Sequence, residues 1–419
     1  MRSHALSQDV SAHNLTPPSH NSVSARWLHV VLMVVAIASW MTFILACVGG
    51  PAWSPDGSQV LFPYRDVAHS QTSVALYDRA TGRVKTIFAQ PTKEKDDDLG
   101  VEVEWQKDGT RALVTLYQHL SSSSGYCELL LIPVRSSAPL QAYGVGSTDG
   151  CTGPHAQFGS RIYFGGQNLR WIDLDSGIVD STSLGDEGVL VHPHGQELVY
   201  IRLNDRPSRS DKDVNETVWE FGHMTPDNLT PKPDFTLWEA DRKKIGLSSD
   251  GEPAAFWDER TSRMAMVSSS ADSDQIAIFD GATGYQRTLT PNIDANLTLG
   301  NLIWTDKMLY AAAFVTTKQE DRKEFSLAEI PLDGSRGRLT RIAAVHSKNE
   351  SDFKAMLNFS MHVSLSPDGN FVAASPAVLD KDDIDARDRA LFLIDLRDPK
   401  RHLQRIPIPV SDTTSRQSK

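Results

Sequence analysis

The sequence predicts an all-β protein, a β-propeller of about seven four-stranded blades preceded by an N-terminal hydrophobic signal or anchor segment. Two observations predict this fold class. The turn sequence Trp-Ser-Pro-Asp-Gly at 53–57 returns as Leu-Ser-Pro-Asp-Gly at 365–369, and a second hairpin pattern follows each turn of this kind. Two successive hairpins make four strands, and four-stranded units in tandem are typical of a β-propeller.

The first recurring unit is a tight turn followed by an apolar strand. Proline presets φ at the second turn position, aspartate accepts hydrogen bonds from nearby backbone N–H groups, and glycine adopts the left-handed conformation that closes the hairpin. Weaker copies lie at 105–117, 191–201 and 247–257. The residues predicted to form these turns are Trp53, Pro55, Asp56, Gly57, Asp108, Gly109, Gly195, Asp250, Gly251, Pro367, Asp368 and Gly369.

The second recurring unit is an apolar strand that ends near Asp and leads through a polar turn, often with Gly, into another strand. It occurs at 74–87, 170–184, 276–289, 327–340 and 391–406. The combined pattern predicts blades that start near residues 51, 102, 155, 188, 245, 300 and 361. The average unit of about 53 residues exceeds known blades, and we assign the excess to long loops at 203–240 and 345–360.

The N-terminal region predicts three segments: a disordered tail at 1–26, a signal or transmembrane segment at 27–46, and the propeller at 47–419. The run 27–48 carries no Asp, Glu, Lys or Arg and is long enough to cross a bilayer as a helix. The tail is rich in Ser, His and Pro, which favours disorder on the cytoplasmic side. We therefore expect the propeller to be exported.

Two forms of membrane attachment compete. Ile44 to Cys47 resembles a bacterial lipobox, in which Cys47 is lipidated and becomes the mature N-terminus. The long leader favours an uncleaved single-span anchor instead, and a conventionally cleaved, secreted protein is a third alternative. Either attachment predicts a cell-membrane or outer-membrane location with the propeller facing the periplasm or the exterior. The tether 48–52 reaches at most about 18 Å.

Cys127 and Cys151 remain as an even pair if Cys47 carries lipid. An oxidising compartment favours a disulfide between them, and two separate buried thiols are the alternative. Six Asn-x-Ser/Thr sequons also occur, which in a eukaryote would favour a glycosylated membrane protein. They begin at Asn14, Asn215, Asn228, Asn296, Asn349 and Asn358.

The turn at 53–57 with its strand, followed by the hydrophobic-Asp-x-x-x-Gly pattern, resembles the WD-like β-propeller repeat of TolB-type and prolyl-oligopeptidase-type proteins. The resemblance is specific at 53–62 and 365–374 and implies the propeller fold. TolB-type proteins carry an α/β domain before the propeller, and five residues between Cys47 and Trp53 leave no room for one. We therefore do not transfer the TolB role.

The sequence motifs that could carry chemistry are weak, and we predict no catalytic residue, metal site or cofactor. His192 and His194 alternate as metal ligands can, but they fall on turn positions of a degenerate repeat. Asp211, Asp213 and Asn215 start like a calcium loop without its distal glutamate. The sequence contains no Gly-x-Ser-x-Gly elbow of a hydrolase. A net charge of −11 argues against a nucleic-acid partner.

Function in propellers resides in loops and faces grafted on the fold. We expect a membrane-anchored cell-envelope module that binds or scaffolds a protein or peptide without enzymatic activity, through the loops 203–240 and 345–360; a small-molecule ligand is left open. The alternative is an envelope enzyme, a lyase, cyclotransferase or glycan hydrolase, with its site at the channel mouth. Carboxylates or histidines gathered at the channel mouth would favour the enzyme.

Overall fold

The structure is a computed structural model, and parts of the chain are described by it. The described residues are 50–66, 70–91, 99–118, 126–135, 137–147, 152–165, 168–184, 187–209, 215–245, 247, 255–258, 263–269, 274–281, 283–317, 322–347, 362–376, 384–385 and 387–409. The predicted tail, the predicted membrane segment, Cys47 and Cys151 lie outside them. No helix among the described residues is long and apolar enough to span a bilayer.

Seven four-stranded sheets make up the described chain, and in each sheet the strands pair in chain order. Blade 1 consists of β1 (Ala52–Trp53), β2 (Gln59–Asp66), β3 (Gln71–Asp78) and β4 (Arg83–Pro91). Blade 2 consists of β5 (Leu99–Trp105), β6 (Arg111–Gln118), β7 (Tyr126–Pro133) and β8 (Gln141–Ser147). Blade 3 consists of β9 (Thr152–Phe158), β10 (Arg161–Gly165), β11 (Leu169–Asp173) and β12 (Val179–Thr182).

The remaining four blades follow the same order. Blade 4 consists of β13 (Glu187–His194), β14 (Glu197–Pro207), β15 (Asn215–Thr225) and β16 (Asn228–Leu237), and the helix α2 (Glu239–Lys244) leads into blade 5. Blade 5 consists of β17 (Ala255–Asp258), β18 (Arg263–Ser269), β19 (Asp274–Asp280) and β20 (Gly284–Leu289). Blade 6 consists of β21 (Leu297–Trp304), β22 (Met308–Thr316), β23 (Arg322–Pro331) and β24 (Arg338–His346). Blade 7 consists of β25 (Val363–Leu365), β26 (Phe371–Ala374), β27 (Ala390–Asp395) and β28 (Leu403–Pro407).

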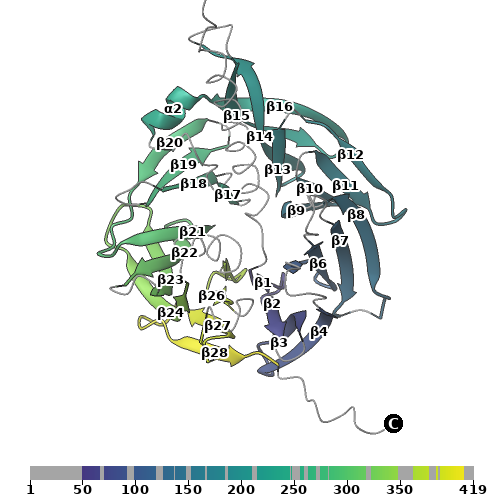
Figure 1. Cartoon of the computed structure of the whole chain (residues 1–419), viewed down its shortest axis with the longest axis vertical. Coiled ribbons are helices and arrows are strands. Elements are labelled where there is room, and N and C mark those ends of the chain that lie inside the picture. Colours follow the sequence, from purple (N-terminus) through teal and green to yellow (C-terminus); the bar gives the residue numbers. More distant parts are fainter. Residues whose placement is uncertain are drawn as a thin grey trace, which may run out of the picture. The chain divides into compact units, whose positions relative to one another are not determined.

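The seven sheets form a ring, which confirms the predicted propeller and its blade number (Figure 1). Figure 1 shows first strands such as β9, β13 and β17 toward the centre, and last strands such as β12, β16 and β28 at the rim. The observed first strands begin close to the predicted blade starts. The fifth blade is the exception, because its first strand begins at Ala255, ten residues after the predicted start.

The core lies between neighbouring blades, where alternate residues of the second and third strands face the next sheet. One apolar cluster joins Phe62 and Tyr64 of blade 1 to Leu391 and Leu393 of blade 7. Similar clusters join blades 1 and 2, and blades 4 and 5. Each sheet therefore buries both faces against its neighbours, which explains the apolar runs that predicted the strands.

The predicted turns of blades 1 and 7 close in the same way. In blade 1 the Ser54 hydroxyl donates to Asp56 at 2.6 Å and accepts from the backbone N–H of Gln59 at 2.9 Å. The Ser366 hydroxyl donates to Asp368 at 2.5 Å and accepts from the N–H of Phe371 at 2.9 Å. The glycines that end these turns have φ of 68° and 70°, where a Cβ would be strained.

Two predictions about connections are corrected. The segment 203–240, predicted as a long loop, instead contains most of β14, β15 and β16 and the start of α2, because its alternating polar residues lie on the exposed faces of long strands. Asp250 and Gly251 lie outside the described residues, and the β17–β18 connection falls after them, at 259–262. Trp257 occupies the position of Trp53, because it pairs with the second strand of its blade in the same register. Of the second predicted loop, 348–360 lies outside the described residues.

The ring closes without strand exchange, because β1–β4 and β25–β28 form separate sheets. Side chains join the two blades at this place, which we call the seam. The Trp53 indole Nε1–H donates to the Ser364 carbonyl of β25 at 3.2 Å. The guanidinium carbon of Arg79 lies 4.2 Å from the Phe371 ring centroid and 5.5 Å from that of Trp53. The seam is thus held by aromatic and cationic side chains.

Candidate functional site

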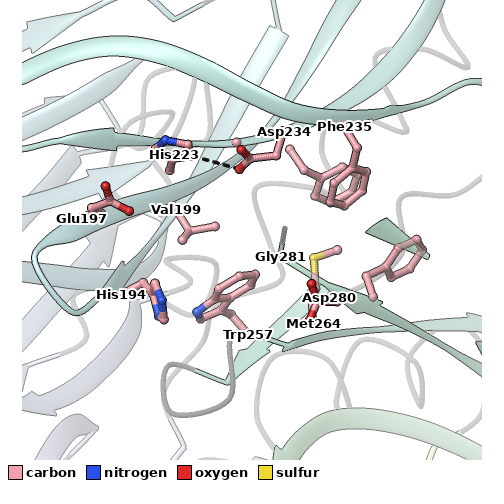
Figure 2. A pocket seen from close by; sticks show the side chains of 13 residues that line it. His194, Glu197, Val199, His223, Asp234, Phe235, Trp257, Met264, Asp280 and Gly281 are labelled. Carbon is pink, nitrogen blue, oxygen red and sulfur yellow. Dashed lines mark hydrogen bonds and ion pairs between the residues drawn. The ribbon is translucent and has the colours of Figure 1, made fainter. Parts of the chain in front are cut away.

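A pocket among the described residues lies between blades 4 and 5, and we call this place junction 4–5. Its volume is about 220 Å³. Figure 2 shows its walls: His194, Glu197 and His223 from blade 4, opposite Trp257, Met264 and Asp280 from blade 5. These residues lie near the turns that join first to second and third to fourth strands, on the same side of the ring as the turn at 53–57.

The register of the blades explains why a pocket opens here. In each blade, the residue directly after the third strand lies beside the first-strand residue that corresponds to Trp53 of blade 1. Its backbone N–H donates back to the first turn in five blades, at Arg79, Val134, Leu174, Leu332 and Leu396. Blade 4 has Pro226 at this position, and blade 5 has Gly281. Blade 5 is therefore the one blade without a side chain here.

Trp257 is exposed to the pocket as a result. It pairs with Met264 in the same register in which Trp53 pairs with Val60. Trp53, covered by Arg79, is 8% exposed, whereas Trp257 is only partly buried. Its indole Nε1 is itself buried and has no hydrogen-bond partner in the described structure. The corresponding indoles of Trp53 and Trp105 donate to backbone carbonyls of the preceding blade, at 3.2 and 3.0 Å.

Stacked aromatic rings form the base of the pocket. Phe221 and Phe235 stack with ring centroids 4.5 Å apart and an interplanar angle of 15°. Phe235 also stacks on Phe279 of blade 5 at 6.1 Å and 6°. Such rings supply apolar area at low entropic cost, and their faces attract cations. The base therefore suits a flat or cationic group.

Polar groups ring the opening. His223 Nδ1 lies 3.0 Å from Asp234 Oδ2, a pair drawn as a dashed line in Figure 2. The His194 ring meets the Trp257 ring edge-on at 6.0 Å. Carboxylates come from Glu197, Asp234 and Asp280, and no Lys or Arg is among the described residues that line the pocket. The described residues hold no group of three or more side chains that could bind a metal ion. The opening is acidic and fits an organic cation.

A second polar cluster lies between blades 2 and 3, on their first strands. His155 Nδ1 of β9 is 3.3 Å from Glu104 Oε1 of β5. Burial opposes the charged imidazole, but Glu104 and then Glu102 outweigh it and raise the pKa of His155. The Tyr117 hydroxyl donates to Glu102, and burial raises the pKa of Glu102 to about 8. The first strands of blades 2 and 3 therefore bring two carboxyl groups, Glu102 and Glu104, close to a histidine, His155.

The residues predicted from the sequence are structural where they are described. Asp108 caps its own turn by accepting from the Thr110 N–H at 2.9 Å, and Gly109 and Gly195 have φ of 70° and 61°. Asp56 reaches across to blade 2, where Arg135 donates to it at 2.7 Å. Arg135, then Ser54, holds the pKa of Asp56 well below its usual range.

One of the two cysteines in the predicted disulfide, Cys127, lies among the described residues. Cys127 is fully buried and forms a disulfide, and both other cysteines of the chain lie outside the described residues. Its pairing with Cys151 stays a prediction. Lipidation of Cys47 stays a prediction for the same reason. Of the two histidines considered as metal ligands, His194 borders the pocket.

The pocket residues were not predicted, although one sequence signal pointed to them. The segments at 74–87 and 276–289 were recognised as the same hairpin, and they differ at one informative place: Asp-Arg-Ala-Thr-Gly in blade 1 is Asp-Gly-Ala-Thr-Gly in blade 5. The exchange of Arg79 for Gly281 marks where a side chain is missing. The aromatic base could not be found, because Phe221, Phe235 and Phe279 come from three strands of two blades.

Comparison with known proteins finds similar solved structures but no family. No family model and no curated protein matches the chain. Among solved structures, TolB from Acinetobacter baumannii is 13% identical with a TM-score of 0.38, over 68% of this chain and 66% of that one, just under two thirds of its length. The C-terminal WD40 domain of Sif2 is 14% identical with a TM-score of 0.43, over 84% and 82%.

A polysaccharide lyase, an ulvan lyase, is 9% identical to the chain. Its TM-score is 0.46, over 83% of this chain and 94% of that one. The similar structures therefore include TolB, a WD40 domain and an enzyme. The β-propeller fold of this chain itself is shown by its seven four-stranded sheets.

Proposed function

We propose that the chain is a propeller-type binding module, displayed at a membrane, that holds a segment of a protein or peptide at junction 4–5. The observation that carries the proposal is the open, aromatic and acidic pocket where every other blade except blade 4 places an Arg, Val or Leu side chain. A pocket of about 220 Å³ has room for one side chain of a partner. Ligand-binding sites in proteins combine apolar walls with a few polar groups that orient the ligand.

The test is photo-crosslinking from the pocket rim. A photoreactive phenylalanine replaces Glu197 in the full-length chain extracted from membranes, and the matched control carries it at Lys85, an exposed residue of β4 on blade 1. We expect a discrete crosslinked protein segment from position 197 and none from position 85. Equal crosslinking from both positions, or none from position 197, contradicts the proposal.

Membrane attachment is the second part of the proposal, and the uncharged run 27–48 supports it. Lipidation of Cys47 and an uncleaved anchor predict different masses. The intact mass of the membrane-extracted protein is expected either to lack residues 1–46 and carry acyl chains, or to equal the full length. Recovery of an unmodified, truncated protein from the soluble fraction alone would contradict attachment.

The polar cluster between blades 2 and 3 favours a second candidate function. The chain would then be an enzyme whose active site is formed by residues on the first strands of the blades. Burial raises the pKa of Glu102 to about 8, so this group holds a proton at neutral pH, and Glu104 Oε1 lies 3.3 Å from His155 Nδ1. A carboxyl group that keeps its proton at neutral pH can act as a general acid. The His155 side chain is 3% exposed, however, so the open pocket supports binding better.

Turnover tests separate the two functions. If the chain is a glycan lyase or hydrolase, Glu104→Gln should abolish turnover while Gly281→Leu, which fills the pocket, leaves it unchanged. Activity on a panel of acidic and neutral glycans, followed by reducing-end and unsaturated-product assays, measures this. Turnover that survives Glu104→Gln excludes the cluster as the catalytic site.

A further inference from the structure

We infer that the pocket at junction 4–5 binds an arginine side chain of the partner. The inference rests on the proposed function and names the chemistry that the pocket recognises. Its basis lies inside the molecule: the seam between blades 7 and 1 already holds an arginine in the corresponding site, and junction 4–5 repeats that site with the arginine removed.

The turns that carry the two positions share an aspartate cap, although Asp78 pairs with Arg83 across its turn and Asp280 pairs with Gly284. The Thr81 N–H and hydroxyl both donate to Asp78 at 2.9 Å, and the Thr283 N–H and hydroxyl both donate to Asp280 at 3.0 Å. Asp78 pairs with Gln59, and Asp280 pairs with Arg263, at the same place in the two sheets. The residue that follows each aspartate, Arg79 in blade 1 and Gly281 in blade 5, therefore occupies the same position directly after the third strand.

Arg79 shows what this place binds. Its guanidinium lies over the rings of Phe371 and Trp53, and its Nη1–H donates to the Gly57 carbonyl at 2.8 Å. Two blades form the site: blade 1 provides Trp53, and blade 7 provides the Phe371 ring. A guanidinium suits such a site because it is planar, stacks on aromatic faces and carries donors at its edge.

Among the described residues, junction 4–5 has a tryptophan at the same position and carboxylates at its opening, and Gly281 in place of Arg79. Trp257 stands at the position of Trp53, and Glu197 begins the second strand of blade 4 as Phe371 begins that of blade 7. A carboxylate thus replaces one of the two rings. Charge-assisted hydrogen bonds between a guanidinium and carboxylates are about twice as strong as neutral ones. The net charge of −11 adds long-range attraction for a cationic segment.

The Trp257 indole explains why the arginine belongs to a peptide. In blades 1 and 2 the corresponding N–H donates to a backbone carbonyl, whereas at junction 4–5, as for Trp304 in blade 6, this donor is buried without a partner in the described structure. A guanidinium has no acceptor for it, but a peptide carbonyl next to the arginine does. A buried donor without a partner costs free energy, which a bound carbonyl would recover.

The test uses the full-length protein and three blocked tripeptides: Gly-Arg-Gly, Gly-Lys-Gly and Gly-citrulline-Gly, where citrulline keeps the shape and loses the charge. Titration calorimetry and tryptophan fluorescence measure binding. We expect the arginine peptide to bind about 10-fold more tightly than the citrulline peptide, which corresponds to about 1.4 kcal/mol. The lysine peptide should fall between them, because an ammonium cannot stack as a plane.

Variants at Gly281 connect binding to the pocket. Gly281→Arg restores the blade 1 sequence and should occupy the site itself, so that peptide binding is lost while the unfolding midpoint stays unchanged or rises. Gly281→Ala leaves the space open and should keep binding. Equal affinity for the citrulline peptide, no binding of any peptide, or binding retained in Gly281→Arg would overturn the inference.

The outcomes separate the inference from the proposed function. If position 197 still crosslinks a partner segment while the arginine and citrulline peptides bind equally, the pocket binds a partner through other chemistry and only the inference fails. If position 197 yields no crosslink and no peptide binds, both fail.

Discussion

The seam and junction 4–5 are built on the same plan, with a first-strand tryptophan facing the preceding blade, and yet one is filled and the other is open. At the seam, Arg79 covers Trp53 and Phe371. At junction 4–5, Gly281 leaves Trp257 uncovered. The seam lacks a chain connection, whereas the chain itself runs from blade 4 through α2 into blade 5. The comparison indicates that Arg79 joins blades 7 and 1, which are not consecutive in the chain. At junction 4–5 the chain itself joins the blades, so the corresponding site can serve another role.

The largest expected effect comes from opening the seam. Arg79→Gly removes the cation–π contacts and the hydrogen bond to the Gly57 carbonyl, and adds backbone entropy to the unfolded chain. We expect the free energy of unfolding to fall by about 2 to 3 kcal/mol. Chemical denaturation measures this, with Arg83→Gly on the exposed start of β4 as the control for the glycine effect. Equal losses in the two variants would show that Arg79 does not hold the seam.

The tryptophans give the next largest contrast. Trp53→Phe leaves the Ser364 carbonyl without its donor, and should lower the free energy of unfolding by about 2 kcal/mol. Trp257→Phe removes an N–H that has no partner in the described structure, so its loss should be at least about 1 kcal/mol smaller. Both variants remove similar apolar area, so the difference reports the hydrogen bond. Equal losses in denaturation experiments would break the comparison.

The contact between blades 2 and 3 should depend on pH. Glu102 titrates near 8 in the folded chain against an ordinary value of 4.5, so the folded state binds its proton more tightly. Its contribution to stability is present at low pH and is lost as pH rises from about 4.5 to about 8. His155, whose pKa is also raised, loses its contribution in the same direction.

The measurement is the free energy of unfolding at pH 5 and pH 9. We expect Glu102→Gln to be more stable than the wild type by about 1 to 2 kcal/mol at pH 9 relative to pH 5. His155→Gln serves as the companion variant, because it removes the second titrating group. Parallel pH profiles for wild type and Glu102→Gln would contradict the assignment.

The smallest effect concerns the bridge from the first turn to blade 2. Asp56→Ala removes the turn cap and the exposed ion pair with Arg135, whereas Asp108→Ala removes a similar cap for which no ion pair is seen among the described residues. Exposed ion pairs contribute about 0 to 1 kcal/mol, so Asp56→Ala should cost about 0.5 kcal/mol more than Asp108→Ala. Thermal unfolding of both variants measures the difference, and a larger loss in Asp108→Ala would refute it.

The sequence predicted the fold well because each blade repeats local chemistry. The turns at Asp56 and Asp368 depend on hydrogen bonds within five residues, and such contacts are visible in the chain itself. The loop predicted at 203–240 failed because long exposed strands carry as many polar residues as loops. The pocket depends on the missing side chain at Gly281 and on aromatic rings of blades 4 and 5. These rings come together only when the two sheets pack against each other. Sequence periodicity does not encode that packing.

The lack of strand exchange at the seam has a consequence for chain order. Every described sheet is made from one continuous stretch of the chain, so the ring is a row of seven units whose two ends meet. Such a row should accept circular permutation. The connection from β12 to β13 spans the width of a blade with the four residues 183–186. A linker of similar length from Pro407 to Ala52 would join blades 7 and 1, and new ends could be placed between any other two blades without dividing a sheet.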